Sequence, residues 1–568
     1  MTSAPQHVRS GAPAELWAAL ALALGGPVAG LYAGLAAGAG FTWGPSSEVM
    51  GRWLRHLGDP ARVVPASVTM RPGVALFTAA AVTVVIWMLG VLALRAWLHH
   101  RGVQTRGLAT RRDVQSMSTA TVLSRASTLR PVHGAAGIHD VGVFVGYREG
   151  HEPVWATIED TFAVIGPARS GKTSRLIAPT IARWPGAAVV TGLRPDVLEW
   201  TVARSDRGRR WVFDPSAAAD SYAGAEPLPW SPLTGCEADI TAAARAKALL
   251  AGLGPAQGQD VYWRGEGEKV LTCYLLAAAT GGYTMTDVVA WSAVETSPVP
   301  IDALGAVGLH NWAKILEGLS TRNDRYRAGV WGQVTQALFP LNMATLARSC
   351  ALRAGEGFDP ATFVDAGTDT IYILGDPDEQ RTVGGLAVAL ITAITAAARR
   401  AARTTARLDP PLLVALDEAA NTAPLHTIDQ LLSSGGGSGI CTIVAFQSLG
   451  QARETYGRDK GDAIIRDLAT VKILFGGEGN ADDLRELGDL LGERDEEVTS
   501  VSQQAGGSVL WGAASVQRHT RLRPVLTTAE LRTLGNTHLG EVLVIPRAAK
   551  AMRTRLPAVW ERNPMRVT

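Results

Sequence analysis

The chain has 568 residues, of which 47% are hydrophobic, which is more apolar than a soluble enzyme usually needs. Its formal charge of +2 excludes a chain that is basic throughout, so any nucleic-acid-binding surface must be local. The four cysteines, Cys236, Cys273, Cys350 and Cys441, are too widely spread for a metal-ligand motif or a disulfide framework, which suits a body in a reducing cytoplasm.

Two uncharged stretches near the N-terminus account for the excess of apolar residues. The first, residues 16–43, exceeds the ~20 residues that span a bilayer, and the second, residues 74–94, contains a dense apolar run. We expect a transmembrane hairpin within residues 1–100. The alternatives are a cleaved signal peptide for the first stretch, with a small-residue site at 37–39, and a buried helix of a soluble core for the second.

The arginines after the second stretch, between residues 95 and 112, place its C-terminal side in the cytoplasm by the positive-inside rule. Arginines between residues 52 and 71 favour the opposite orientation, but the run GPARSGKTS at 166–174 has the pattern of a nucleotide-binding loop, and such a site must face the compartment that holds nucleotide. We therefore expect a multi-pass protein of the inner (cytoplasmic) membrane with its catalytic body in the cytoplasm. Residues 101–140 are expected to be a basic linker, whose arginines contact lipid headgroups, fix the topology or bind nucleic acid.

A strand–helix alternation begins after this linker. A short strand is predicted at 141–145, and buried strands follow at 162–165, 187–191 and 211–213. Such alternation predicts an α/β fold with a parallel sheet covered on both faces.

A glycine-rich run directly follows the strand at 162–165 and leads into a helix. Its two glycines let backbone N–H groups fold around a polyphosphate, Lys172 reaches the outer phosphates, and the Thr173 hydroxyl ligates Mg²⁺. The alternative is a glycine-rich turn with an incidental Lys-Thr pair. The predicted ATP-binding loop consists of Gly166, Pro167, Ala168, Arg169, Ser170, Gly171, Lys172, Thr173 and Ser174.

The alternation stops at the proline-rich segment 227–232, and residues 236–352 are mostly helical in pattern. We expect an all-alpha domain over 236–352, inserted into a nucleotide-binding domain made of residues 141–235 and 353–568. A polar segment at 497–507 is expected to be a mobile loop. Further strands are predicted at 370–374, 412–416, 441–446, 471–475 and 542–545.

The strand at 412–416 ends in two acids, Asp417 and Glu418. This is the pattern of a Walker B segment, in which Asp417 holds the Mg²⁺ and Glu418 orients or deprotonates the attacking water. A helix N-cap would explain one acid but not both.

Two further residues are candidates for the catalytic machinery. Gln447 directly follows the strand at 441–446, where a polar side chain can sense the terminal phosphate, although a surface glutamine would fit as well. Arg466 precedes the strand at 471–475 and is a candidate arginine finger for a neighbouring subunit, or else an ordinary solvent-facing arginine.

Taken together, the apolar hairpin and the motifs GPARSGKTS, WVFDPS, PLPWSPL, LLVALDEAAN and AFQSLGQARETYG resemble the type IV secretion coupling proteins of the TraG/TraD group, over residues 14–558. The resemblance implies a membrane-anchored, FtsK-related, RecA-like P-loop ATPase with an inserted all-alpha domain that assembles as a hexamer around a channel. Such proteins couple a relaxase-bound DNA strand, or protein substrates, to the secretion channel during conjugation.

Carried over by position, Lys172 and Thr173 match the phosphate loop of the family, Asp417 and Glu418 its Walker B pair, and Gln447 its FQS-type strand end. Arg466 matches less closely. The chain departs from the family at residues 192–196, where a lysine-glycine-acid motif is usual, and at 435–437, where an arginine is common. The competing interpretations are an FtsK-like DNA translocase and a non-catalytic membrane receptor for secretion substrates.

Overall fold

This computed structural model describes residues 107–561, except 135–136, 149–150, 193–194, 215–221, 223, 257, 376–379, 503–514 and 536–538, and also describes residues 88, 90 and 92. The chain divides into two units, 1–106 and 107–568, and the elements below belong to the second. The first expected membrane span lies outside the described residues, and of the second only residues 88, 90 and 92 are described, each of them helical. Within the described part, one helical stretch, Gly384–Thr405, is long and apolar enough to cross a bilayer, but most of it is buried inside the fold.

The centre of the second unit is a twelve-stranded sheet in which eight consecutive strands, out to one edge, are all parallel, as the strand–helix alternation predicts. The side chains of its central strands are buried throughout because helices cover both faces. In sheet order these strands are β10 (Val471–Phe475), β3 (Phe162–Ile165), β9 (Ile440–Phe446), β8 (Leu412–Leu416), β4 (Ala188–Gly192), β7 (Thr370–Leu374), β5 (Arg210–Phe213) and β6 (Glu226–Pro227).

Four antiparallel strands extend this sheet beyond β10. They follow in the order β13 (Glu541–Pro546), β14 (Met552–Arg555), β1 (Gly142–Tyr147) and β2 (Pro153–Thr157). The strands expected at 141–145 and 542–545 correspond to β1 and β13, whereas β2 and β14 were not predicted. The last strands of the chain therefore connect the first two strands to the parallel sheet.

Alternate residues of each central strand enter two different cores, one on each face of the sheet. Phe162 and Val164 of β3 pack with the helix that follows the glycine-rich loop. Ala163 and Ile165 of the same strand contribute to the core that contains Leu390 and Ile394 of α16 (Gln380–Thr405). The phosphate-loop helix and α16 thus cover opposite faces.

The described part of the expected basic linker packs onto this body. It contains α4 (Thr119–Ser124) and α5 (Ala126–Leu129), and Val122 and Leu129 are fully buried. Arg130 is also buried and forms an ion pair with Asp409. This arginine therefore serves to attach the segment to the body rather than to contact lipid or nucleic acid.

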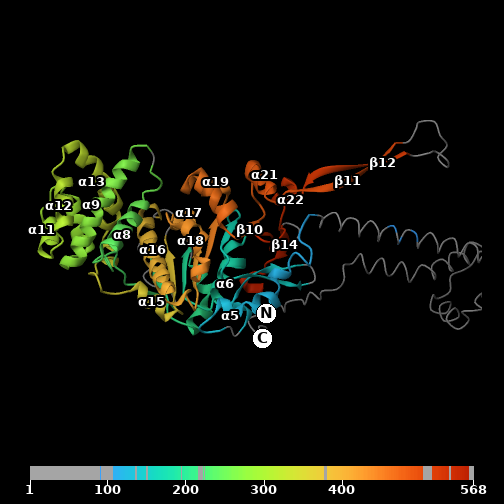
Figure 1. Cartoon of the computed structure of the whole chain (residues 1–568), viewed down its shortest axis with the longest axis horizontal. Coiled ribbons are helices and arrows are strands. Elements are labelled where there is room, and N and C mark those ends of the chain that lie inside the picture. The colour runs from blue at the N-terminus through green and yellow to red at the C-terminus, as the bar shows by residue number, and fades with distance from the viewer. Residues whose placement is uncertain are drawn as a thin grey trace, which may run out of the picture. The chain divides into compact units, whose positions relative to one another are not determined.

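A group of helices, visible at one end of the second unit in Figure 1, is formed by the part of the chain that connects β6 to β7. At its centre the Trp331 indole N–H donates to the Tyr274 hydroxyl at 3.0 Å. The helices are α8 (Asp239–Ala251), α9 (Asp260–Gly281), α10 (Met285–Ser292), α11 (Val299–Ala306), α12 (His310–Ser320), α13 (Asp324–Leu338) and α14 (Ala344–Ser349). The next helix, α15 (Pro360–Ala366), packs against α16 in the body of the unit.

The prediction of a mobile loop at 497–507 is wrong for residues 497–502. Residues up to Ser502 belong to β11 (Glu493–Ser502), which pairs with β12 (Ser515–Pro524) in a separate two-stranded sheet. Polar residues occupy both the odd and the even positions of this strand, so its sequence lacks the alternation of apolar and polar residues that marks a half-buried strand.

The shorter helices of the body are α6 (Ala178–Arg183), α7 (Asp196–Trp200), α17 (Ala419–Thr422), α18 (Ile428–Ser434), α19 (Leu449–Tyr456), α20 (Arg458–Ala463), α21 (Ala481–Asp489) and α22 (Thr528–Arg532).

Candidate nucleotide-binding site

The glycine-rich loop needs glycine at both of its key positions. A Cβ at Gly166 would lie 2.6 Å from the Cβ of Phe475 on the neighbouring strand β10, and Gly171 has a φ of +97°, which L side chains rarely adopt. The Gly166 N–H also donates to the carbonyl of Phe446 at the end of β9. The loop is therefore held tightly between the ends of β10 and β9.

Lys172 opens the helix after the loop, in a π-helical turn over Lys172–Ile177. Its ammonium group donates to the carbonyls of Gly166 at 2.5 Å and Pro167 at 3.0 Å. Burial lowers the pKa of Lys172, and the nearby Asp417 and Glu418 oppose that shift. A buried cation satisfied by loop carbonyls lies ready for a stronger anionic partner such as a phosphate.

The two predicted nucleotide motifs meet at Thr173 and Asp417, which are 244 residues apart in the chain: the Thr173 hydroxyl donates a hydrogen bond to an oxygen of the Asp417 carboxylate. Burial raises the pKa of Asp417, against the opposing effects of this hydrogen bond and of Lys172. The other carboxylate oxygen, Oδ1, is buried and finds no hydrogen-bond partner among the described residues. Such an orphaned oxygen beside a threonine hydroxyl fits a divalent cation.

Glu418 adopts a left-handed backbone conformation, with φ 51° and ψ 47°, directly after β8. This conformation is uncommon for a residue with a side chain and costs energy, so its occurrence at the end of a buried strand points to a functional constraint. Glu418 lines the same pocket as the phosphate loop.

That pocket has a volume of about 300 Å³. It brings Lys172, Thr173, Asp417 and Glu418 together, as the motifs predict. It is lined by residues 168–174, Thr191, Gly192, Asp196, Val197, Trp200, Asp417 and Glu418.

Sequence reasoning missed Thr191, Asp196 and Trp200 as pocket residues. The Thr191 hydroxyl donates to the backbone carbonyl of Asp417 at 2.9 Å and so fixes the end of β8 from the neighbouring strand β4. Asp196 and Trp200 belong to α7, which follows β4. One sequence feature near these residues was the departure from the family's lysine-glycine-acid motif at residues 192–196, at the end of β4. No local sequence pattern shows that β4 and β8 are neighbours in the sheet.

Gln447 lies at the carboxyl end of β9, and β9 pairs with β3 on one side and β8 on the other. Its backbone N–H donates to the side chain of Gln451 at 2.8 Å. Gln447 thus stands between the two strands that carry the nucleotide motifs, although it does not line the 300 Å³ pocket.

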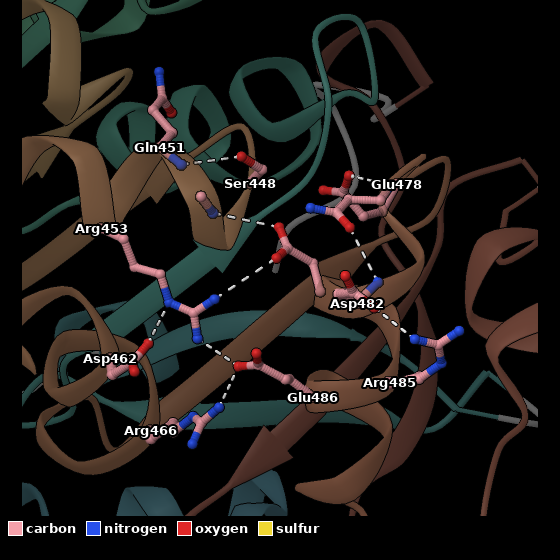
Figure 2. A network of polar contacts seen from close by, with 12 residues as sticks. Ser448, Gln451, Arg453, Asp462, Arg466, Glu478, Asp482, Arg485 and Glu486 are labelled. Carbon is pink, nitrogen blue, oxygen red and sulfur yellow. Dashed lines mark hydrogen bonds and ion pairs between the residues drawn. The ribbon is translucent and has the colours of Figure 1, made fainter. Parts of the chain in front are cut away.

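Arg466 is separated from this pocket and bound to an acid of its own chain. Its guanidinium pairs with Glu486 of α21, which is shared with Arg453 of α19, as Figure 2 shows. Arg453 also binds Asp462 at 2.7 Å. Within one subunit, Arg466 therefore belongs to a polar network that joins α19, α20 and α21.

The residues present fit Mg²⁺ held partly by a nucleotide. Across the described ranges, no group of three or more His, Cys, Asp or Glu residues could hold a metal ion by itself. Magnesium at nucleotide sites typically has one or two protein ligands, with phosphates and waters completing the octahedron, so Thr173 and Asp417 are sufficient.

A parallel sheet with a phosphate-type loop after β3 and paired acids after β8 defines a RecA-like P-loop fold. Solved structures of the conjugative coupling protein TrwB share this fold. An unbound form has a TM-score of 0.56 at 15% identity, covering 79% of this chain and 93% of that one. A TrwB complex with ADP and Mg²⁺ has a TM-score of 0.54 at 14% identity, covering 72% of this chain and 87% of that one.

Residues 411–536 match the family described as the TraM recognition site of TraD and TraG. The conjugal transfer protein TraG of Agrobacterium fabrum is 27% identical over 301 residues, which cover 50% of this chain and 44% of that protein. The chain thus spans less than half the length of this curated relative. The chain is thus similar, in this region and in fold, to type IV secretion coupling proteins of the TraG/TraD group, the group that its motifs also resemble.

Proposed function

We propose that the chain is a membrane-anchored ATPase that couples DNA, carried by a relaxase, or secreted protein substrates to a type IV secretion channel. The hydrogen bond between Thr173 and Asp417 carries this proposal, because it joins the phosphate loop and the paired acids in one pocket. The TrwB complexes with ADP and Mg²⁺ and with a non-hydrolysable ATP analogue support the choice of ligand.

Each residue has a proposed role in hydrolysis. Residues 166–174 would wrap the phosphates, with Lys172 on the outer ones, and Thr173 and Asp417 would hold the Mg²⁺, which neutralises phosphate charge. Glu418 would orient and deprotonate the attacking water, and Gln447 would sense the terminal phosphate from the end of β9. Arg466 would act on the nucleotide of a neighbouring subunit after leaving Glu486.

The proposed assembly is a homo-hexamer around a channel, anchored by spans at about 16–43 and 74–94. Residues 236–352 would form an all-alpha domain inserted into the nucleotide-binding domain of residues 141–235 and 353–568. DNA would be gripped mainly through its phosphate backbone, so binding would tolerate any sequence and weaken with salt.

The test is ATP hydrolysis by the full chain in detergent, with and without DNA. Lys172→Ala should abolish hydrolysis and weaken ATP binding, whereas Glu418→Gln should keep ATP binding and lower turnover by about 10²–10⁴-fold, the usual contribution of a general base. Hydrolysis by Lys172→Ala at the parent rate would refute the site. ATP binding without turnover in the parent chain would instead support the non-catalytic receptor.

A further inference from the structure

β11 and β12 form a two-stranded ribbon that is separate from the main sheet. The two strands are paired along their whole length, from Glu493 opposite Pro524 to Ser502 opposite Ser515. In Figure 1 the ribbon extends away from the body of the second unit. Neither outer edge has a strand partner in the described part of the chain, so both are open to pairing with a further strand.

The two strands carry opposite charge. β11 contains four acidic residues and one arginine, a formal charge of −3, whereas β12 contains three arginines and no acid, a formal charge of +3. The ribbon therefore has one acidic and one basic edge. Charged edge strands usually prevent pairing between identical edges, but edges of opposite sign are complementary.

The ribbon side chains that the structure describes, at 493–496 and 520–524, are exposed or half-buried and belong to no core. On one face the exposed Asp495 lies opposite Leu522, which is 62% exposed. On the other face Glu496 pairs with Arg523. Because a two-stranded ribbon is marginally stable by itself, and the described side chains of its faces are not buried in a core, its edges are surfaces available to stabilise it.

We propose that the acidic edge of β11 pairs with the basic edge of β12 from the next copy of this chain, so that the ribbons of a ring join into one continuous sheet. Rotation about the ring axis keeps every neighbouring pair antiparallel, because each ribbon contributes one strand in each direction. This head-to-tail contact closes a ring, whereas a two-fold contact would place like charges opposite each other. The inference rests on the proposed cyclic assembly and specifies a contact within it.

A nucleic acid is the competing occupant, since the arginines of β12 could bind phosphates. The acids of β11 lie one strand away from them, with Glu496 in an ion pair with Arg523, and would repel a polyanion. The alternation of acidic and basic strands favours a second copy of the same ribbon.

The test is disulfide formation between copies of the full chain in detergent. One tagged chain carries Asp495→Cys, and a differently tagged, co-expressed chain carries a single cysteine at Thr520, Leu522 or Pro524 in turn, so that the unknown register between copies is scanned. The four native cysteines are buried and contribute little background. As a control, a chain with Glu317→Cys, at an exposed position on α12, measures how many disulfides form by random collision between copies.

Mild oxidation should link the two tags for at least one of the three positions, at least tenfold above the Glu317→Cys background. Two Asp495→Cys chains should not link, because the β11 strands of adjacent copies would be about 10 Å apart, beyond disulfide reach. Linkage of Asp495→Cys to itself would overturn the head-to-tail contact.

The native mass of the same sample distinguishes a failure of the proposed contact between ribbons from a failure of the proposed ring assembly. A ring of the expected mass without linkage overturns this contact and leaves the assembly standing, whereas a monomer overturns both. If a thirty-nucleotide oligo(dT) protects Leu522→Cys from a maleimide and no linkage forms, β12 binds nucleic acid instead.

Discussion

The Thr173 hydroxyl donates to the carboxylate of Asp417 across 244 positions of sequence, and this contact joins the end of β8 to the first turn after the phosphate loop. The two groups are the proposed protein ligands of Mg²⁺, and the second oxygen of Asp417 is buried without a partner within the described chain. The contact therefore prepares a cation site whose two protein ligands lie in segments that follow two different strands, β3 and β8.

Replacement of Thr173 by valine should weaken the Mg²⁺ dependence of hydrolysis. Valine keeps the shape of the side chain but removes the hydroxyl, so the apparent affinity for Mg²⁺ should fall by about 10–100-fold, while Thr173→Ser should stay within a few-fold of the parent. The measurement is ATP hydrolysis as a function of Mg²⁺ concentration. An unchanged Mg²⁺ midpoint in Thr173→Val would remove this residue from the metal site.

Gly436 and Gly437 should respond very differently to alanine. A Cβ at Gly436 would lie 1.9 Å from the backbone oxygen of Glu159, whereas a Cβ at Gly437 meets nothing within 4 Å. Gly436→Ala should lower the free energy of unfolding by about 1–3 kcal/mol through a forced backbone shift, and Gly437→Ala should be close to neutral. Urea titration of the two variants side by side checks this, and equal midpoints would contradict it.

Arg466 can be tested in mixed assemblies. Arg466→Ala keeps its own phosphate loop, and Lys172→Ala keeps its own arginine, so a mixture of the two inactive chains should regain part of the ATPase activity if Arg466 acts on the neighbouring subunit. If Arg466 serves only the contact with Glu486, mixing restores nothing, and Glu486→Gln impairs the chain to a similar extent. The readout is hydrolysis at a fixed total protein concentration.

The protein should lose stability as the pH falls below neutral, because of His426. Burial, together with Lys247 and Lys460, lowers the pKa of His426 to about 4. Unfolding therefore takes up a proton between the ordinary histidine pKa and about 4, so stability rises with pH across this window and falls on acidification. We expect a loss of about 1–2 kcal/mol between pH 7 and pH 5, after allowance for partial exposure.

Thermal unfolding at pH 7 and pH 5 measures this loss, and His426→Gln should reduce the difference because glutamine takes up no proton. The same difference in the variant and the parent would assign the acid sensitivity to other groups.

Much of the parallel sheet could be predicted from sequence, because its strands are short apolar runs that end in motifs. The predicted bounds of the strands at 162–165, 370–374, 412–416 and 471–475 agree with β3, β7, β8 and β10. The pairing of the two nucleotide motifs could be predicted as well, since each follows a strand of one parallel sheet.

The rest of the fold and of the site could not be predicted, because it depends on contacts between residues that are far apart in the sequence. β2 begins with Pro153 at the edge of the sheet, where a strand has little sequence signature. Arg204 is buried, and its guanidinium donates to the carbonyls of Trp184, Gly186 and Thr368, a role that no local pattern indicates. The pairing of Arg466 with Glu486 likewise requires knowing that η9 (Ile464–Leu468), a π-helical turn, lies beside α21.

The place of β14 between β13 and β1 has a consequence for biosynthesis. The Thr554 hydroxyl donates to the carbonyl of Val145, 409 positions earlier in the chain. Since β13 and β14 are synthesised after the other strands of this sheet, β1 and β2 must wait through the synthesis of the intervening body before they can join the parallel strands. Until β13 and β14 emerge, β1 and β2 can pair only with each other, and a stop of translation before β14 leaves this pair unattached to the parallel sheet.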